Sequence, residues 1–262
     1  MPGVTILKFD KSLGSAAYSK LIRQIDRRFN VLLHMQLSFR ANLLALMIPA
    51  DQKIGFPRRY SRELHRWVVR RAISPPTATH VVDFYMQFAR ALVPCDDEPA
   101  WDLPVPEAAF SWVSEHLDAH KPALLIAPAA SNSERNWLAS RYAAIADYAC
   151  EAGFDVVVTT GPAEKEVALA REIEALASNK IINLAGTTSL KQLIALCRGV
   201  DVVVGPDSGT LHIANSQGTA VVGLYAHSNP ARTGPYNNLH LVVDAYSNLL
   251  FDQKGRRSSQ VP

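Results

Sequence analysis

The sequence predicts an α/β protein with two doubly wound domains, and three observations support this class. From residue 121 onward, short apolar runs alternate with amphipathic segments of helical period. These runs are apolar at nearly every position, which indicates strands buried on both faces of a parallel sheet. Residues 94–106, rich in Pro and acidic residues, separate this region from a weaker version of the same pattern and therefore read as a linker.

The individual elements follow from residue type and spacing. In the first half of the chain the predicted strands are 4–10, 30–36 and a short one near 53–56, and the predicted helices are 15–29, 39–48, 61–73 and 80–93. In the second half the predicted strands are 123–130, 154–161, 180–186, 201–209 and 219–226, and the predicted helices are 137–153, 162–177, 189–199 and 210–218. Gly153 closes the first of these later helices, and Pro162 stands near the start of the next.

The composition is that of an ordinary globular protein. The 262 residues are 48% hydrophobic and 19% charged, which excludes a mainly disordered chain, a collagen-like repeat and a heptad rod. The net charge of +3 hides an uneven distribution. Residues 1–97 carry 15 basic against 7 acidic residues, and residues 98–262 carry 12 against 17. Halves of opposite sign suggest two surfaces with different partners.

The cysteines and apolar segments indicate the compartment. Cys95, Cys150 and Cys197 are odd in number and show no Cys-x-x-Cys spacing, which argues against a disulfide framework and a zinc cluster and favours buried thiols. No apolar run is long enough to span a bilayer, and the first residues lack the pattern of a secretory signal. We therefore expect a soluble cytoplasmic protein.

The most informative segment is 202–236, where a buried strand ends and a short helix begins. Asp207, Ser208, Gly209 and Thr210 stand between them, and His212 follows on the first helical turn. The free N–H groups and the positive dipole end of a helix N-terminus suit a phosphate, and Gly209 lets an anion approach the backbone. The alternative is an ordinary capping turn, in which Asp207 or Ser208 satisfies those N–H groups.

Three other loops after predicted strands carry polar residues. Because the strands are parallel, their loops open at one edge of the sheet. Residues 130–137 offer the Ser131 hydroxyl and the Arg135 cation, or form only a solvated loop with a helix cap. Glu164 and Glu166 either accept hydrogen bonds from ribose hydroxyls or stabilise a helix N-terminus as first-turn acids. The loop 186–192 contributes Thr187, Thr188 and Ser189, so that four loops converge on a phosphate-compatible edge.

Together these residues resemble glycosyltransferase family 9, the ADP-heptose:lipopolysaccharide heptosyltransferases. The resemblance lies in APAASNSERNW, GPAEKEVALAREI, LAGTTSLKQLIAL, GPDSGTLHIA with the following GLY and GPY, and more weakly in residues 30–93. It implies a GT-B fold of two Rossmann-like domains. It also implies inverting transfer of heptose from ADP-heptose to the lipopolysaccharide inner core, with no cofactor and no obligatory metal. The implied nucleotide-sugar contacts are Ala130, Ser131, Arg135, Glu166, Thr188, Asp207, Ser208, Gly209 and His212.

The resemblance also divides the chain. It implies a partial, acceptor-side Rossmann-like domain over 1–97, a linker and connecting helix over 98–120, a nucleotide-sugar-binding Rossmann-like domain over 121–245, and a polar tail over 246–262. The family opens with a strand, a Gly-Asp turn that supplies the general base, and a helix. This chain opens instead at PGVTILKFDKSLGSAAYSK, and Asp10 aligns poorly with that base, so the catalytic residue is unassigned. A fragment, a wrongly chosen start and a degraded relative are the three explanations.

Two alternatives to an active transferase are a non-catalytic nucleotide-sugar-binding relative and a sugar-nucleotide 2-epimerase, which shares the GT-B fold. The basic residues of the first half bear on the partner. Arg62, Arg66 and Arg70 have the spacing of one helix stripe, joined by Arg58 and Arg59 just before it. Such a patch fits the anionic lipopolysaccharide acceptor and the inner face of the inner membrane, or is a solvated helix face. Nucleic acid is disfavoured because no stacking aromatic residues interleave with the arginines.

Overall fold

A computed structural model describes residues 3–62, 64–93 and 98–247. The chain divides into two compact units, Met1–Glu98 and Pro99–Pro262, which are described separately. Cys95 and most of the predicted polar tail lie outside the described residues. Of the other two thiols, Cys197 is buried, as expected, and Cys150 is half-buried.

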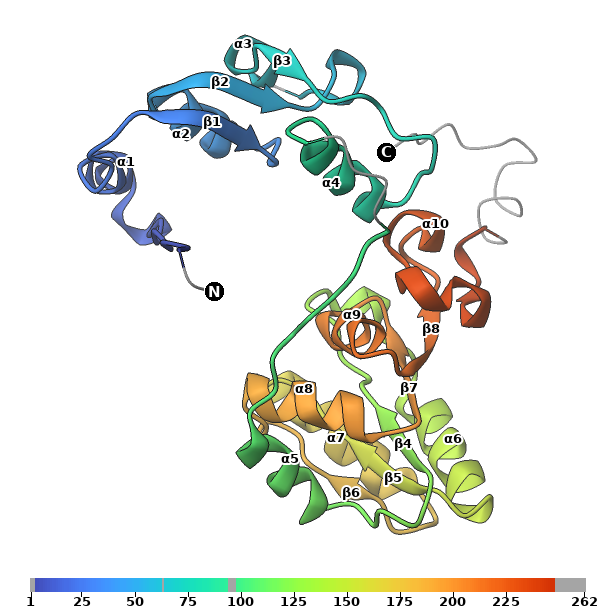
Figure 1. Cartoon of the computed structure of the whole chain (residues 1–262). Coiled ribbons are helices and arrows are strands. Elements are labelled where there is room, and N and C mark those ends of the chain that lie inside the picture. The colour runs from blue at the N-terminus through green and yellow to red at the C-terminus, as the bar shows by residue number, and fades with distance from the viewer. Residues whose placement is uncertain (1–2, 63, 94–97, 248–262) are drawn as a thin grey trace. The chain divides into compact units, whose positions relative to one another are not determined.

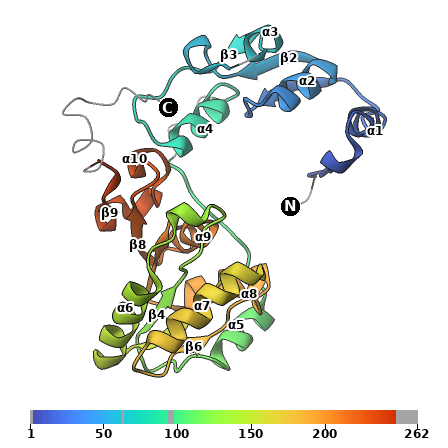
Figure 2. The same cartoon turned by 180° about the vertical axis from the view of Figure 1, so that it is seen from behind.

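Unit 1 is built on a three-stranded parallel sheet of order β1-β2-β3 (Figures 1 and 2). Its strands are β1 (Phe29–His34), β2 (Ala50–Gly55) and β3 (Arg71–Ala72), and its helices are α1 (Ala16–Ile22), α2 (Phe39–Met47), α3 (His65–Val68) and α4 (Val81–Arg90). Two 3-10 turns, η1 (Lys11–Leu13) and η2 (Arg58–Tyr60), complete it. Ile54, Ile73 and Phe88 are buried together and form its small core.

Two predicted elements of unit 1 are wrong. Residues 4–10 form no strand, and Val4 and Ile6 are 60% and 88% exposed, because no described strand lies beside them to supply the ladder that a strand needs. The helix predicted over 61–73 is only the single turn α3, because the sheet captures the following residues. The N–H of Arg70 donates to the Lys53 carbonyl oxygen at 3.0 Å, and that of Ile73 to Gly55 at 2.9 Å.

The arginine stripe predicted for that helix is therefore wrong as well. Arg62 precedes α3, Arg66 lies within it, and Arg70 follows it in an extended segment. Helical spacing in the sequence does not place these three side chains on one face, since the helix is only four residues long.

Unit 2 contains a six-stranded parallel sheet of order β6-β5-β4-β7-β8-β9. The strands are β4 (Ala123–Ile126), β5 (Asp155–Val158), β6 (Ile182–Asn183), β7 (Val202–Pro206), β8 (Ala220–Tyr225) and β9 (Val243–Asp244). The order runs outward from β4 in one direction and from β7 in the other, which is the doubly wound, dinucleotide-binding arrangement. The predicted strands and helices of this half are confirmed with shorter bounds, except that the helix predicted from residue 210 begins at Gly209; β9 was not predicted.

Helices cover both faces of the sheet in unit 2 (Figures 1 and 2). They are α5 (Glu107–Ser114), α6 (Ala139–Glu151), α7 (Glu164–Leu176), α8 (Leu190–Gly199) and α9 (Gly209–Ser216), followed by the short α10 (Pro230–Thr233) and two 3-10 segments, η3 (Ser133–Arg135) and η4 (Tyr236–Leu241). Leu125 and Val203 point into one buried cluster with α5, α8 and α9, and Ile126 and Val204 into another with α6 and α7. Burial on both faces explains why the strand sequences are continuously apolar.

The central strands approach closely where the strand order reverses. The N–H of Ala127, just past β4, donates to the Val204 carbonyl oxygen of β7 at 2.9 Å. A Cβ atom at Gly205 would collide with the carbonyl oxygen of Ala127 and meet the Leu211 side chain at 3.0 Å. Glycine is therefore required at this position by backbone proximity.

A buried polar network joins the carboxyl ends of β1 and β2 in unit 1. The Asn42 side-chain oxygen lies 2.7 Å from Nε2 of His34 and 3.2 Å from Nδ1 of His65, and Nε2 of His65 accepts the Phe56 N–H at 3.0 Å. His65 therefore carries its proton on Nδ1 and is neutral. Burial, with a smaller contribution from His34, lowers the pKa of His65 from 6.5 to about 4.

We expect unit 1 to lose stability in acid, because the folded protein binds a proton at His65 less readily than the unfolded chain does. The stability that neutral His65 contributes is complete above pH 6.5 and is lost as the pH falls toward 4. Between pH 7.5 and pH 5 the loss is roughly 2 kcal/mol. Hydrogen exchange of the β1 and β2 amides, corrected for intrinsic rates, measures it. His65→Gln should remove most of this acid sensitivity; a variant as acid-sensitive as the wild type contradicts the assignment.

Candidate functional site

The loops that follow β4 and β7 meet at the point where the strand order reverses. Nη1 of Arg135, from the β4 loop, lies 3.3 Å from Oδ2 of Asp207 and 3.4 Å from the Asp207 carbonyl oxygen. Asn132 caps the 3-10 turn that carries Arg135, because its side chain accepts the Glu134 N–H at 3.2 Å. Two residues predicted for one anion site, 72 positions apart, are thus brought together.

Asp207 is the most connected side chain of this edge. It is 8% exposed, its Oδ1 lies 3.4 Å from Nε2 of His212, and its Oδ2 accepts from Oγ of Ser228 at 2.7 Å. Burial raises the pKa of Asp207, but the hydrogen bonds from His212 and Ser228 and the charge of Arg135 outweigh it and hold the pKa below its ordinary value. Asp207 is therefore an anion at neutral pH, and its role is to hold cations.

The start of α9 leaves two polar atoms unsatisfied. Oγ of Ser208 and Nε of Arg135 are buried without a hydrogen-bond partner. Ser208 occupies the N-cap position but its side chain makes no capping hydrogen bond, so the capping-turn alternative does not account for it. A Cβ at Gly209 would meet nothing within 4 Å, so the backbone there is open. Two buried donors beside a free helix N-terminus are suited to the oxygens of a phosphate.

The other predicted site residues have mixed roles. Oε2 of Glu166 accepts the Gly161 N–H at 3.0 Å, which fixes it at the end of β5, whereas Glu164 is exposed. The Thr188 hydroxyl lies 3.2 Å from that of Thr159. Ser131 is exposed, and the N–H of buried Ala130 is taken by the Asn136 side chain at 2.8 Å. These assignments as nucleotide contacts stay predictions.

A fifth loop, between β8 and α10, also opens at this edge and was not predicted to belong to the site. Ser228 and Thr233 both direct hydroxyl groups at Asp207, at 2.7 and 3.4 Å. The signal was available, because HSNPARTG follows a predicted parallel strand and must open at the same edge. Nε2 of His227, in this loop, lies 3.9 Å from Oε2 of Glu134 in the β4 loop.

The five arginines of the predicted basic patch are all exposed, but they are spread over several segments. Arg58 and Arg59 lie in η2, where the Arg59 guanidinium stands 4.6 Å from the centre of the Tyr60 ring. The Arg66 guanidinium stands 4.9 Å from the centre of the Trp67 ring, and Trp67 is 69% exposed. Arg59 and Arg66 thus each lie over the aromatic ring of the next residue in the chain.

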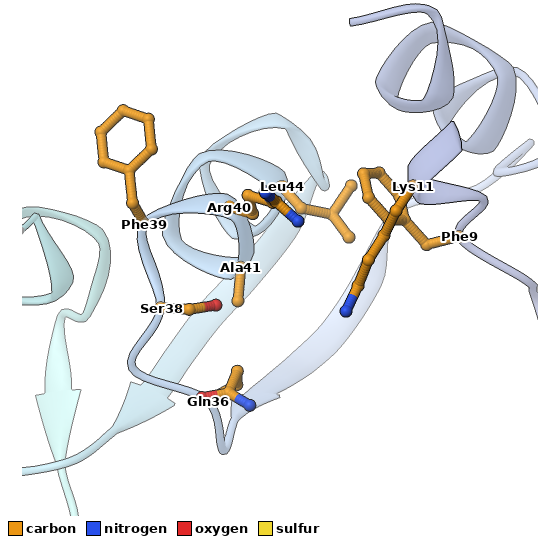
Figure 3. Close-up of a pocket in the computed structure, with 8 residues that line it drawn as sticks. All are labelled: Phe9, Lys11, Gln36, Ser38, Phe39, Arg40, Ala41 and Leu44. Carbon is orange, nitrogen blue, oxygen red and sulfur yellow. The ribbon is translucent and has the colours of Figure 1, made fainter. Parts of the chain in front are cut away.

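Unit 1 also contains a pocket of about 650 Å³ between η1 and the start of α2 (Figure 3). It is lined by Phe9, Lys11, Gln36, Ser38, Phe39, Arg40, Ala41 and Leu44. Lys11 and Arg40 are exposed, and neither forms a salt bridge with any residue that the structure describes. The pocket thus combines two unpaired cations with the phenyl ring of Phe9, whereas the Phe39 ring points away from the other labelled side chains (Figure 3). Neither cation belonged to the basic patch identified in the sequence.

Two further features bear on chemistry. Within residues 3–62, 64–93 and 98–247, no group of three or more His, Cys, Asp or Glu side chains could hold a metal ion. Over the same part of the chain, no helix is both long and apolar enough to cross a membrane.

The strand order and the polar loops at the carboxyl ends of β4 and β7 define unit 2 as a Rossmann-like domain. Residues 18–257 match glycosyltransferase family 9 (heptosyltransferase), and the chain belongs to this family. It is 40% identical over 263 residues to the lipopolysaccharide core heptosyltransferase OpsX of Haemophilus influenzae, covering all of this chain and 76% of that protein. It is 25% identical to lipopolysaccharide heptosyltransferase 3 of Escherichia coli K12, covering 83% of this chain and 64% of that protein.

Solved structures agree on the fold. A family 9 glycosyltransferase from Veillonella parvula superposes with a TM-score of 0.76 at 20% identity, covering 98% of this chain and 75% of that one. ADP-heptose heptosyltransferase II of E. coli superposes with a TM-score of 0.69 at 22% identity, covering 88% of this chain and 72% of that one. The predicted GT-B class, with two Rossmann-like parallel-sheet units, is confirmed. In the described residues unit 1 has three strands and unit 2 has six.

We expect Ser208→Ala to separate stability from binding. Because the Ser208 hydroxyl is buried without a partner, its removal should leave the free energy of unfolding unchanged or raise it slightly. Binding of inorganic diphosphate should weaken by about tenfold, as expected for a lost hydrogen bond to a charged group. Thermal unfolding and calorimetry measure the two quantities. A clear loss of stability with unchanged diphosphate affinity would show that the hydroxyl is structural.

Proposed function

We propose that this chain binds ADP-heptose at the carboxyl edge of β4 and β7 and transfers the heptose, with inversion, to the inner core of lipopolysaccharide. The observation that carries the proposal is the pair of unsatisfied donors, Ser208 Oγ and Arg135 Nε, beside the start of α9. Membership of family 9 and the names of the relatives supply the donor and acceptor classes.

In this reaction the residues of the nucleotide site would stabilise the ADP leaving group. In an inverting transfer an acceptor hydroxyl displaces the diphosphate at the anomeric carbon, and negative charge grows on the departing ADP. Arg135, His212 when protonated and the N-terminal N–H groups of α9 supply positive charge at that point. We propose that they do so without a cofactor or an obligatory metal ion.

The base that takes the acceptor proton is not assigned among these residues. Asp10, the weak sequence candidate, accepts from the N–H and hydroxyl of Ser12 at 3.0 and 2.7 Å and so caps η1. Its capping role favours neither catalysis nor contact with an acceptor. This leaves a non-catalytic nucleotide-sugar-binding protein as the second candidate, which predicts ADP binding without turnover.

We further propose that the pocket of unit 1 receives an anionic sugar of the acceptor. Lys11 and Arg40 would pair with carboxylate or phosphate groups, and the Phe9 ring offers an apolar face to a sugar ring. The basic patch of Arg58, Arg59, Arg62, Arg66 and Arg70 is then free to face anionic lipid on the cytoplasmic side of the inner membrane.

Calorimetry with ADP tests the nucleotide site. The wild-type chain should bind ADP, and Asp207→Ala combined with His212→Ala should weaken binding at least tenfold, because Arg135 loses its anchor and the diphosphate loses a donor. Asp118→Ala with His120→Ala, the same residue types at the opposite edge of the sheet, is the matched control and should bind normally. The site assignment is wrong if the folded wild type does not bind ADP, or if the two double variants bind ADP equally well.

A transfer assay with ADP-heptose and a water-soluble core acceptor tests the acceptor pocket. Lys11→Ala with Arg40→Ala should raise the acceptor KM about tenfold and leave ADP affinity unchanged, because the pocket belongs to unit 1. Arg66→Ala with Arg70→Ala should instead reduce binding to anionic vesicles with little effect on that KM. If Lys11→Ala with Arg40→Ala reduced vesicle binding, and Arg66→Ala with Arg70→Ala raised the acceptor KM, the pocket would be the lipid-facing surface and the basic patch the acceptor site. ADP binding without any turnover would favour the non-catalytic candidate.

A further inference from the structure

The loop between β8 and α10 reaches the nucleotide site from a third strand. Ser228 donates its hydroxyl to Oδ2 of Asp207 at 2.7 Å, which is the shortest contact that this carboxylate makes. Thr233 approaches the same oxygen at 3.4 Å. Neither hydroxyl lies among the residues that the family resemblance assigned to the nucleotide sugar.

Asp207 is poorly suited to touch a diphosphate itself, since both groups are anions. Its use is to hold Arg135 on one oxygen and His212 on the other. Both contacts, at 3.3 and 3.4 Å, are longer than the 2.7–2.9 Å of a tight charge-assisted hydrogen bond. Arg135 and His212 are therefore held near the carboxylate without being fully engaged by it, and Arg135 keeps N–H donors, including its unpaired Nε, for another anion.

The Ser228 contact explains how that loose arrangement persists. A buried carboxylate needs its lone pairs satisfied, and without another donor Oδ2 would draw the Arg135 guanidinium into a closer pair. The short bond from Ser228 satisfies Oδ2 and fixes the carboxylate plane. Oδ1 then stays directed at His212, and Arg135 stays at its present distance.

The Ser228 loop is itself braced from several sides. The side chain of Asn229 accepts the Ala231 N–H at 3.0 Å and caps α10. The Tyr225 hydroxyl, from the end of β8, donates to the Thr233 carbonyl oxygen at 2.9 Å. Because both flanks of the loop are fixed, the Ser228 hydroxyl has a fixed position and can restrain the Asp207 carboxylate.

We propose that Ser228 is a positioning residue of the nucleotide site, acting through Asp207 to present Arg135 and His212 to the diphosphate. This inference rests on the proposed function of the same edge. It predicts that Ser228 affects only ligands with a diphosphate, and only while Arg135 and His212 are present.

The test is calorimetry with ADP and with AMP as the paired probes. Ser228→Ala should weaken ADP binding about tenfold and AMP binding less than threefold, because AMP lacks the second phosphate that the positioned cations meet. Ser228→Thr keeps the hydroxyl and should restore ADP affinity to within threefold of the wild type. Ser247→Ala is the matched control, because its hydroxyl donates to the Asp244 carboxylate at 2.6 Å outside the site; it should bind ADP normally.

A second arm separates positioning from a structural role. In a chain that already carries Arg135→Ala and His212→Ala, the further change Ser228→Ala should alter ADP affinity less than twofold. If Ser228→Ala does not fold, Ser228→Cys, with a weaker donor of similar size, should give an intermediate loss.

The outcomes are distinct. Absent ADP binding by the wild type overturns the proposed function, and this inference with it. Normal ADP binding by Ser228→Ala, an equal loss for ADP and AMP, failure of Ser228→Thr to restore affinity, or an undiminished effect in the Arg135→Ala, His212→Ala background each overturns the positioning role alone.

Discussion

The close approach of β7 to the end of β4 is the constraint on which the rest of unit 2 depends. Gly205 lies so near the Ala127 carbonyl oxygen that no side chain fits between them. This approach keeps the two central strands paired up to the point where the strand order reverses, so the loops after both strands leave the sheet side by side. The contact between Arg135 and Asp207 follows from that geometry.

The site is held together by a buried charge that is shared among several donors. A buried carboxylate without partners would be strongly destabilising, but Asp207 has polar neighbours from the β4 and β8 loops and from α9 and α10. Ser208 Oγ and Arg135 Nε remain buried and unsatisfied in the same place. Two buried donors left unpaired beside a satisfied carboxylate are suited to a second anion, which supports the proposed diphosphate site.

Much of unit 2 could be predicted from the sequence, because its local signals and its tertiary structure agree. Continuously apolar runs such as ALLI and DVVV can be buried only between two helical layers, and parallel connection then fixes which loops share an edge. Thus Arg135 and Asp207 could be assigned to one site before any distance was known. Ser228 could not be assigned to Asp207, because a hydroxyl contact of 2.7 Å depends on loop conformation and not on periodicity.

Unit 1 was predicted less well because tertiary contacts override its local pattern. The segment 61–73 has helical spacing, yet backbone pairing of Arg70 and Ile73 with β2 ends the helix after one turn. The buried His34–Asn42–His65 network joins β1, α2 and α3 through side chains far apart in the sequence, and no spacing rule indicates it. A crystal structure of this chain with ADP would test the central claim most directly. We expect diphosphate oxygens within hydrogen-bond distance of Ser208 Oγ and Arg135 Nε. ADP bound elsewhere, with both atoms still unpaired, would contradict it.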